Sequence, residues 1–299
     1  MSVRRDRMMA AACLAVALLA GAAAAVGVFA RGTGATAEAT SIRGERFEYA
    51  TDGVYAYNAE RVVAEGVGWD AATLVLAAPA LLISAVAIAR GSLRARLFAA
   101  GVLGCLTYQY LMYSVFWALG PLFPVFVVLY PASFATLVWI VSSVDVRQLA
   151  SRLDGRFPRR GIAAFCAAMA VLLVGMWSAR IARGLAGDVA GAQLLGTPTL
   201  AVQALDLGIV VPLCVATAAL VLARRPAGYL LGALLPVKGA LMAAAICAML
   251  VSAWIVEGRA EIAPLAVFAA ATIAAAALAV RALSGLARAE AAGAGALKA

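Results

Sequence analysis

The chain has 299 residues, of which 65% are hydrophobic and 13% are charged, and its formal net charge is +9. Soluble domains are about half apolar and a quarter charged, so this composition excludes an ordinary soluble fold, a disordered chain and a disulfide-built secreted scaffold. The chain contains no histidine, which excludes imidazole zinc sites, Ser-His-Asp triads and histidine proton shuttles. We therefore predict a polytopic membrane protein with one integral membrane domain over residues 1–299.

Eight segments are apolar over a length that can cross a bilayer, for which a helix needs roughly 20 residues. In chain order they are Met8–Ala30, Ala71–Ala89, Leu97–Leu119, Leu122–Ser142, Gly161–Ile181, Leu200–Ala223, Tyr229–Val256 and Ala263–Leu283. None alternates apolar and polar residues as the strands of a transmembrane barrel do. The pattern predicts an all-α fold, a transmembrane helical bundle of eight spans, and shows no clear internal repeat.

The first span has an alternative interpretation. Its basic start, its apolar run and the triplet Ala35-Thr36-Ala37 resemble a signal peptide with its cleavage site. The apolar run of about 23 residues is longer than the usual 7–15-residue core of a signal peptide, which favours a retained helix. Cleavage would leave seven spans.

The distribution of Lys and Arg indicates the orientation, because these residues concentrate in cytoplasmic loops. With a cytoplasmic N-terminus, that side holds sixteen basic residues and four acids, Asp6, Asp145, Asp154 and Glu290. The basic residues are Arg4, Arg5, Arg7, Arg90, Arg94, Arg96, Arg147, Arg152, Arg156, Arg159, Arg160, Arg224, Arg225, Arg281, Arg288 and Lys298. Both termini are then cytoplasmic. The basic face suits anionic headgroups of a bacterial inner membrane rather than a nucleic acid.

Two outer connecting segments are long, and one inner loop is short and charged. Arg31–Asp70 is acidic and rich in tyrosine; it is predicted to be a solvated linker with a short helix near Ala59–Val67, and the alternative is a cap over an outward-facing cavity. Ala182–Thr199 is rich in glycine, which predicts a loop or a re-entrant turn. The inner loop Val144–Arg160 is predicted to be a charged anchor at the membrane surface.

The five cysteines, at positions 13, 105, 166, 214 and 247, all lie inside apolar spans without C-x-x-C spacing. They are predicted to be small buried hydrophobic residues rather than metal or redox ligands. No cofactor is predicted.

Lys238 is expensive to place in a membrane, because an ionised side chain at the bilayer centre costs at least about 2.5–3.5 kcal/mol unless it is paired or faces a cavity. The rise of a helix puts it about 15 Å from the inner boundary, near the midplane. Pro236 removes a backbone hydrogen bond nearby, and broken helices at this depth often form transporter sites. The alternative is a structural lysine satisfied by one carboxylate or by backbone carbonyls.

Asp206 stands near the outer end of span six. The helical rise places it about 12 Å further out than Lys238, so a direct ion pair between the two needs a tilt, a kink or a water chain. Arg180 and Arg183, at the outer end of span five, are the predicted partners of this carboxylate.

A tyrosine-rich patch, Leu106–Tyr113, forms the third polar feature. Gln109 and Tyr113 share one helix face, while Tyr108 and Tyr130 are predicted to lie at the depth of Lys238. These groups would supply hydroxyl groups and ring faces to a small organic ligand or a lipid headgroup; the alternative is hydrogen bonding between helices. The candidate ligand-binding residues are Tyr108, Gln109, Tyr113, Tyr130, Asp206 and Lys238, and no metal or catalytic residue is predicted.

Two stretches carry a resemblance. Trp69-Asp70 with Tyr108–Tyr130, and Asp206–Pro212 followed by Arg224–Tyr229 and Lys238, resemble bacterial polytopic membrane proteins to which no activity is assigned. The resemblance covers about two thirds of the chain and implies no function. This chain has Pro124 where that pattern has asparagine, so no polar role is implied there.

Three functions remain. The first is binding or transport of a small solute or lipid at a site between spans three, four, six and seven. The second is a non-catalytic structural or sensory protein that meets a partner through Arg31–Asp70. The third, an intramembrane enzyme, is the least favoured, because the chain lacks H-E-x-x-H and G-x-S-x-G motifs and paired carboxylates at the midplane.

Overall fold

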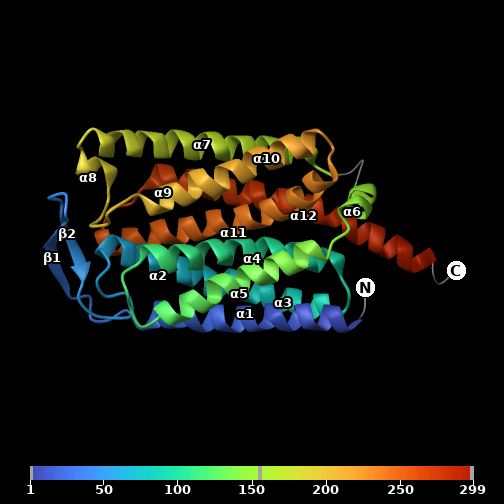
Figure 1. Ribbon diagram of the computed structural model, residues 1–299, viewed down its shortest axis with the longest axis horizontal. Helices are drawn as coiled ribbons and strands as arrows, with labels where there is room; N and C mark the ends of the chain where they lie inside the picture. The colour runs from blue at the N-terminus through green and yellow to red at the C-terminus, as the bar shows by residue number, and fades with distance from the viewer. Residues whose placement is uncertain (1–2, 154–156, 297–299) are drawn as a thin grey trace.

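Long apolar helices run side by side along most of the molecule in the computed structural model, which describes residues 3–153 and 157–296 (Figure 1). Within this described part, seven helices are long and apolar enough to cross a membrane. The prediction of a helical membrane bundle is therefore confirmed in its coarse form. Asp154, Arg156 and Lys298 lie outside the described residues, as do the side chains of Arg288 and Glu290.

The chain divides into two runs of elements joined by the short helix α6 (Val146–Leu153). The first run comprises α1 (Val3–Phe29), β1 (Thr36–Thr40), β2 (Arg46–Ala50), α2 (Glu60–Ala72), the π-helical segment η1 (Thr73–Ala77), α3 (Ala78–Ala89), α4 (Leu93–Phe116) and α5 (Phe123–Ser142). The second comprises α7 (Arg159–Leu185), α8 (Val189–Ala192), α9 (Ala201–Leu205), the π-helical segment η2 (Asp206–Val210), α10 (Val211–Leu222), α11 (Pro226–Glu257) and α12 (Ile262–Ala296). We call these runs the first and second halves.

The halves repeat one arrangement, which corrects the expectation that no repeat exists. Each begins with a helix of 27 residues, and its second long helix contains a π-helical segment of 5 residues. In each half a helix of 12 residues with proline at its second position follows. A tight turn then leads to two long helices that pack on each other, α4 with α5 and α11 with α12. In membrane proteins, such repeats place ligand sites where the repeats meet.

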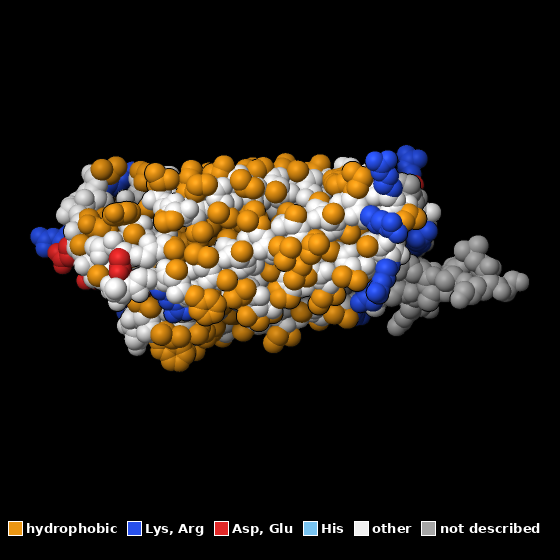
Figure 2. Space-filling view, turned by 90° about the horizontal axis from the view of Figure 1, so that it is seen from below, with side chains coloured by type: hydrophobic (Ala, Val, Ile, Leu, Met, Phe, Trp, Pro, Cys, Tyr) orange, Lys and Arg blue, Asp and Glu red, His pale blue; other side chains and the backbone are white. Residues whose placement is uncertain are grey.

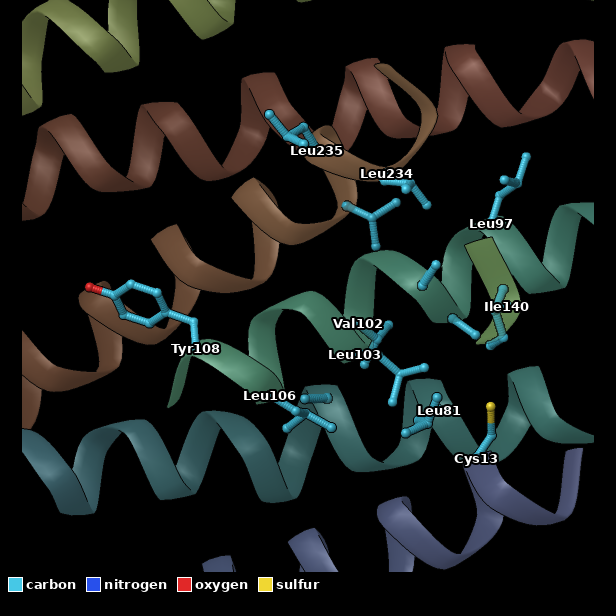
Figure 3. Packing of buried hydrophobic residues seen from close by; sticks show 14 of the residues in the cluster. Cys13, Leu81, Leu97, Val102, Leu103, Leu106, Tyr108, Ile140, Leu234 and Leu235 are labelled. Atoms are coloured by element: carbon cyan, nitrogen blue, oxygen red, sulfur yellow. The ribbon is translucent and has the colours of Figure 1, made fainter. Parts of the chain in front are cut away.

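Helix α4 is the predicted third span, but it is absent from the seven helices that meet the membrane criterion in the described chain. Its polar residues explain this, because Tyr108, Gln109, Tyr110 and Tyr113 lower its mean hydropathy. All four are buried. Figure 3 shows residues of α4 packed between side chains of α1, α3, α5 and α11, so α4 is a central helix of the bundle.

The segment between α1 and α2 differs from the predicted linker. Strands β1 and β2 form an antiparallel hairpin in which Thr36 pairs with Ala50 and Thr40 with Arg46. The predicted short helix is instead the beginning of α2, which continues through η1 into α3, so that Glu60–Ala89 is one helical span. Three charged residues of α2 concealed this: Arg61 and Glu65 form an ion pair and Asp70 is buried, so they are not the solvated residues of a linker.

Two further connecting segments contain helices that the sequence did not predict. For Ala182–Thr199 the structure has the loop rather than the re-entrant turn: α7 continues to Leu185, and the loop beyond α8 contacts the hairpin, where the Gly196 N–H donates to the Glu45 carboxylate at 3.4 Å. The inner loop contains α6, an amphipathic helix that buries Leu149 and Leu153 against α11 and α12.

The two ends of the bundle differ in charge. Both termini, α6 and the turns α3–α4 and α10–α11 lie at one end, and we call it the arginine end (Figure 1). Lys and Arg side chains gather there, whereas hydrophobic side chains cover the middle (Figure 2). At this end Arg96 of α4 donates to Asp6 of α1 at 2.6 Å. Helix α1 also packs on α3 and α5. The opposite end, with β1, β2 and α8, is called the hairpin end.

Glycines allow close helix crossings, and one provides a stability test. A Cβ atom added at Gly68 of α2 would lie 2.6 Å from the Met249 Cα of α11, whereas one added at Gly175 of α7 would meet nothing within 4 Å. Because backbone cannot yield as a side chain can, we expect Gly68→Ala to lower the free energy of unfolding by about 1–3 kcal/mol. Gly175→Ala is the matched control and should leave it unchanged or slightly higher. Equal thermal unfolding midpoints for the two variants would contradict the close crossing.

Candidate functional site

The π-helical segment η2 determines where Asp206 points. Pro212, the second residue of α10, has no N–H to donate to the carbonyl of Gly208, and its ring pushes that carbonyl aside. The backbone adopts the wider π turn here, closed by the Val211 N–H on the Asp206 carbonyl. Pro79 stands in the same relation to η1. Such π segments occur frequently at functional sites.

Asp206 is buried and accepts hydrogen bonds at both oxygens. The Tyr108 hydroxyl of α4 donates to Oδ1 at 2.6 Å, and the Trp177 indole N–H of α7 donates to Oδ2 at 2.9 Å. The Tyr108 hydroxyl points away from the packed aliphatic side chains around α4 (Figure 3). The bond from Tyr108 joins the two halves, since it runs from the first half to the second.

Lys238 approaches the same tyrosine from α11. Its Nζ lies over the Tyr108 ring, 5.0 Å from the centroid, within the range of a cation–π contact. Its stem passes Gly104 of α4, where an added Cβ would lie 3.7 Å from Lys238 Cδ. Helix α11 runs through Pro236 without a break, so the predicted broken helix at this depth was wrong; the irregular turns near the site are the π segments. The ring of Tyr108 therefore connects the two charged groups, which form no ion pair with each other among the described residues.

Arg180 and Arg183 are not the partners of Asp206. Arg180 donates to Gln193 and its guanidinium lies 5.2 Å from the Trp177 ring centroid. Arg183 forms no ion pair in the described part of the chain. The prediction of an interfacial Asp–Arg pair was wrong, because neither arginine lies within ion-pair distance of Asp206, whose partners are Tyr108 and Trp177.

Gln109 and Tyr113 belong to a second buried cluster, around Asp70 of α2. Asp70 Oδ1 lies 3.4 Å from both the Gln109 amide nitrogen and the Tyr113 hydroxyl, while the Tyr55 hydroxyl donates to Oδ2. Thr73 donates to the other atom of the Gln109 amide, Oε1, at 2.8 Å. Two neighbouring residues of α4 therefore contact two different acidic clusters: Tyr108 bonds to Asp206, and Gln109 bonds to Asp70.

Tyr130 is not part of either cluster. It is half-buried on α5 and packs against the hydrophobic core. Of the six predicted residues, the structure brings together Tyr108, Asp206 and Lys238, places Gln109 and Tyr113 at Asp70, and leaves Tyr130 apart.

A cavity of about 400 Å³ reaches from the hairpin end down to Asp206. Six aromatic residues line it: Trp69, Tyr108, Phe116, Trp117, Trp177 and Phe268. Four methionines, at positions 112, 176, 242 and 249, add flexible apolar surface. Trp69 stacks on Tyr108 with 6.2 Å between ring centroids, so the cavity wall continues directly into the site.

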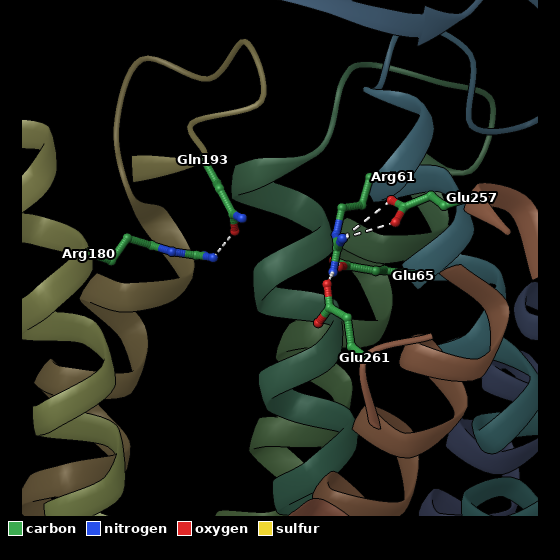
Figure 4. Close-up of polar contacts among 6 residues, drawn as sticks. All are labelled: Arg61, Glu65, Arg180, Gln193, Glu257 and Glu261. Atoms are coloured by element: carbon green, nitrogen blue, oxygen red, sulfur yellow. Dashed lines mark hydrogen bonds and ion pairs between the residues drawn. The ribbon is translucent and has the colours of Figure 1, made fainter. Parts of the chain in front are cut away.

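Charged residues surround the outer part of the cavity (Figure 4). Arg61 of α2 forms ion pairs with Glu65 at 2.9 Å, Glu257 at 3.2 Å and Glu261 at 2.8 Å, and so connects α2 to the end of α11 and the start of α12. Across the opening, Arg180 of α7 bonds to Gln193 near α8. Three carboxylates and the guanidinium group of Arg61 therefore lie close together at this rim.

A narrower groove of about 110 Å³ continues from the cavity between α7, α10, α11 and α12. Leu173, Asp206, Met242, Ile246 and Phe268 line both spaces, so the two share a wall. The groove is apolar apart from the side chains of Asp206 and Lys238. We call the two adjoining spaces together the channel; it is charged at the rim, aromatic in the middle and aliphatic at Lys238.

Sequence reasoning missed Trp177 and the Arg61 network. Trp177 lies near the end of an apolar span, where interfacial tryptophans are common, so its type gave no distinguishing signal. Arg61 and its partners Glu257 and Glu261 are 196 and 200 residues apart in the chain. Of its ion pairs only Arg61–Glu65, at helical spacing, could have been predicted.

Comparisons with known proteins add no homologue: no family model, no curated protein and no solved structure matches the chain.

Proposed function

We propose that the chain is a multi-pass protein of a bacterial inner membrane that binds and carries a small amphipathic solute or lipid. The contiguity of the charged rim, the aromatic cavity and the apolar groove through Asp206 carries this proposal. Ligand sites are typically concave, mostly apolar and provided with a few placed polar groups. The apolar part of the ligand would occupy the groove, and polar substituents would face the rim.

The repeat of the two halves supports a carrier. Tyr108 comes from the first half, and Asp206 and Lys238 come from the second, so the site lies where the halves meet. Secondary transporters commonly bind their substrates at such an interface, next to interrupted helices. The sequence shows no clear internal repeat, which does not favour a transporter. The matching order and lengths of the helices in the two halves support one.

The basic residues support an orientation with the arginine end in the cytoplasm. Cytoplasmic loops of membrane proteins carry an excess of Lys and Arg, and the cytoplasmic leaflet supplies anionic headgroups for them. The hairpin end, and with it the charged rim of the cavity, would then face the outside.

Filling the groove tests whether an amphiphile binds there. Leu173 of α7 lines both the cavity and the groove, whereas Val171 on the same helix is 73% exposed and lines neither. We expect Leu173→Trp to reduce co-purification of bound lipid or other amphiphile at least about tenfold, a loss of ~1.4 kcal/mol in binding. Val171→Trp, the matched control, should retain it.

Mass spectrometry of organic extracts from the purified protein in mild detergent measures the retained amphiphile. Equal retention by the Leu173→Trp and Val171→Trp variants, with both folded, would show that the channel is not the binding site.

A further inference from the structure

Lys238 differs from the other cations that lie between helices of the bundle. Arg61 has three carboxylates and Arg96 has Asp6 as partners. The Lys238 Nζ, by contrast, has no hydrogen-bond acceptor and no ion pair among the described residues, although it lies deep in the bundle. Its contact is with the face of the Tyr108 ring, which attracts a cation but accepts none of its three N–H groups as a carboxylate would.

Asp206 does not satisfy this ammonium group. Tyr108 and Trp177 already donate to its two oxygens, and the ring of Tyr108 lies under the Lys238 Nζ while its hydroxyl reaches the carboxylate. Donors left without acceptors in a low-dielectric interior cost free energy. The unmet requirement of the site is therefore an acceptor or an anion, and the open side of Lys238 is the groove.

We propose that the ligand carries an anionic oxygen group, a carboxylate or a phosphate, on an apolar chain, and that this group binds the Lys238 ammonium in the groove. This inference rests on the proposed function and specifies its ligand class. The aliphatic walls of Leu213, Leu235 and Met242 accept the chain next to the head, and the aromatic cavity above accepts the remainder. A cationic amphiphile would instead be repelled by Lys238.

An anionic ligand is compatible with the contact between Lys238 and Tyr108. Lys238 lines the groove and Tyr108 does not, so a ligand in the groove would leave the Tyr108 ring in place beside the ammonium group. Carboxylates and phosphates both accept charge-assisted hydrogen bonds from an ammonium. Two kinds of ligand carry such an anionic group on one apolar chain: a free fatty acid, and a monoacyl phospholipid with a terminal phosphate.

Fluorescence of cis-parinaric acid on the full chain in phosphatidylcholine nanodiscs tests the inference. Palmitate, palmitoyl lysophosphatidic acid, methyl palmitate and hexadecyltrimethylammonium serve as competitors. In the wild-type protein, we expect palmitate or the lysophosphatidic acid to compete at least about thirtyfold better than methyl palmitate, as for a buried charge pair. The better of the two acids identifies the source of the anionic group.

Two variants separate charge from volume. Lys238→Met keeps the length of the side chain and removes its charge, so affinity for the acids should fall about thirtyfold while methyl palmitate binds as before. Lys238→Arg keeps the charge and should retain preference for the acids. The comparison of palmitate with its methyl ester uses wild-type protein alone, so it decides the question even if Lys238→Met fails to fold.

The outcomes distinguish the inference from the proposed function. Equal binding of palmitate and methyl palmitate, or preference for hexadecyltrimethylammonium, would overturn the anionic ligand and leave an amphiphile-binding channel in place. Failure of parinaric acid and of every competitor to bind wild-type protein would overturn the proposed function as well.

Discussion

Replacing Asp70 with alanine is expected to lower the free energy of unfolding by more than about 3 kcal/mol. Asp70 is 1% exposed and accepts hydrogen bonds from Tyr55, Gln109 and Tyr113. Alanine would leave these three donors without their acceptor inside the bundle, at about 1–3 kcal/mol for each buried group. No cation pairs with Asp70 among the described residues. The expected loss of stability therefore comes from the three hydrogen bonds and not from an ion pair.

Asp70→Asn is the matched variant, because it keeps an acceptor oxygen and almost the same volume. It should recover most of the stability that Asp70→Ala loses. Unfolding in a detergent titration, followed by tryptophan fluorescence, measures both. If alanine and asparagine destabilise the protein equally, the hydrogen bonds from Tyr55 and Tyr113 contribute little, and Asp70 stabilises the bundle by some other means.

The two acidic clusters are related by the repeat. Thr73 and Asp206 each stand six residues before a proline, Pro79 and Pro212, at the beginning of the π segments. One helical turn earlier, the first half has Asp70 and the second has Gln203. Each half therefore carries a buried polar pair at the same place, but the carboxylate is at the first position of one pair and at the second position of the other.

This exchange has a structural consequence. Helix α4 of the first half bonds to both pairs, through Gln109 to Thr73 and through Tyr108 to Asp206. The cluster around Asp70, in the first half, is covered by Tyr55 and Trp117, whose ring centroids are 4.5 Å apart. The second-half cluster opens into the cavity and the groove. One polar pair is thus enclosed by aromatic side chains, whereas the other borders the cavity and the groove.

Much of the bundle follows from composition and hydropathy, since apolar runs of sufficient length leave few alternatives in a membrane. The depth of Lys238 and Tyr108 follows from the helical rise, and the structure places them in contact. The contact to Asp206 does not follow from the rise, because the Tyr108 side chain spans the separation that the calculation left between Asp206 and Lys238. A side chain that is long and polar at its tip can join groups at different depths.

The rest depends on distant pairings. The hairpin β1–β2 has strands of only 5 residues, and tertiary contacts stabilise it rather than strong local preferences. The repeat is invisible in residue identity, since a π segment followed by proline can be built from Thr73–Ala77 or from Asp206–Val210 with little in common. Only the positions of Pro79 and Pro212 could have indicated the repeat from the sequence.

The bond between the halves has the second large expected effect. Asp206→Leu should lower the free energy of unfolding by about 3 kcal/mol or more, because it leaves the Tyr108 and Trp177 donors unsatisfied and removes a carboxylate that attracts Lys238. Tyr108→Phe removes one hydroxyl and keeps the ring under Lys238, so it should cost only about 1.5–3 kcal/mol. In the double variant Tyr108→Phe/Asp206→Leu, the phenylalanine has no hydroxyl group that requires an acceptor. The loss of stability should therefore be smaller than the sum of the losses in the two single variants.

A double-mutant cycle measures this coupling, which we expect to be about 1.5–3 kcal/mol, the range for a hydrogen bond to a charged group. Tyr130→Phe is the matched control: its ring lies on α5, apart from Asp206, so the same cycle should give additive losses. Additivity in the Tyr108 cycle would mean that the 2.6 Å bond contributes nothing to the folded state. The two halves would then be held together by the packing of α2 and α4 on α11 and by the ion pairs of Arg61 with Glu257 and Glu261.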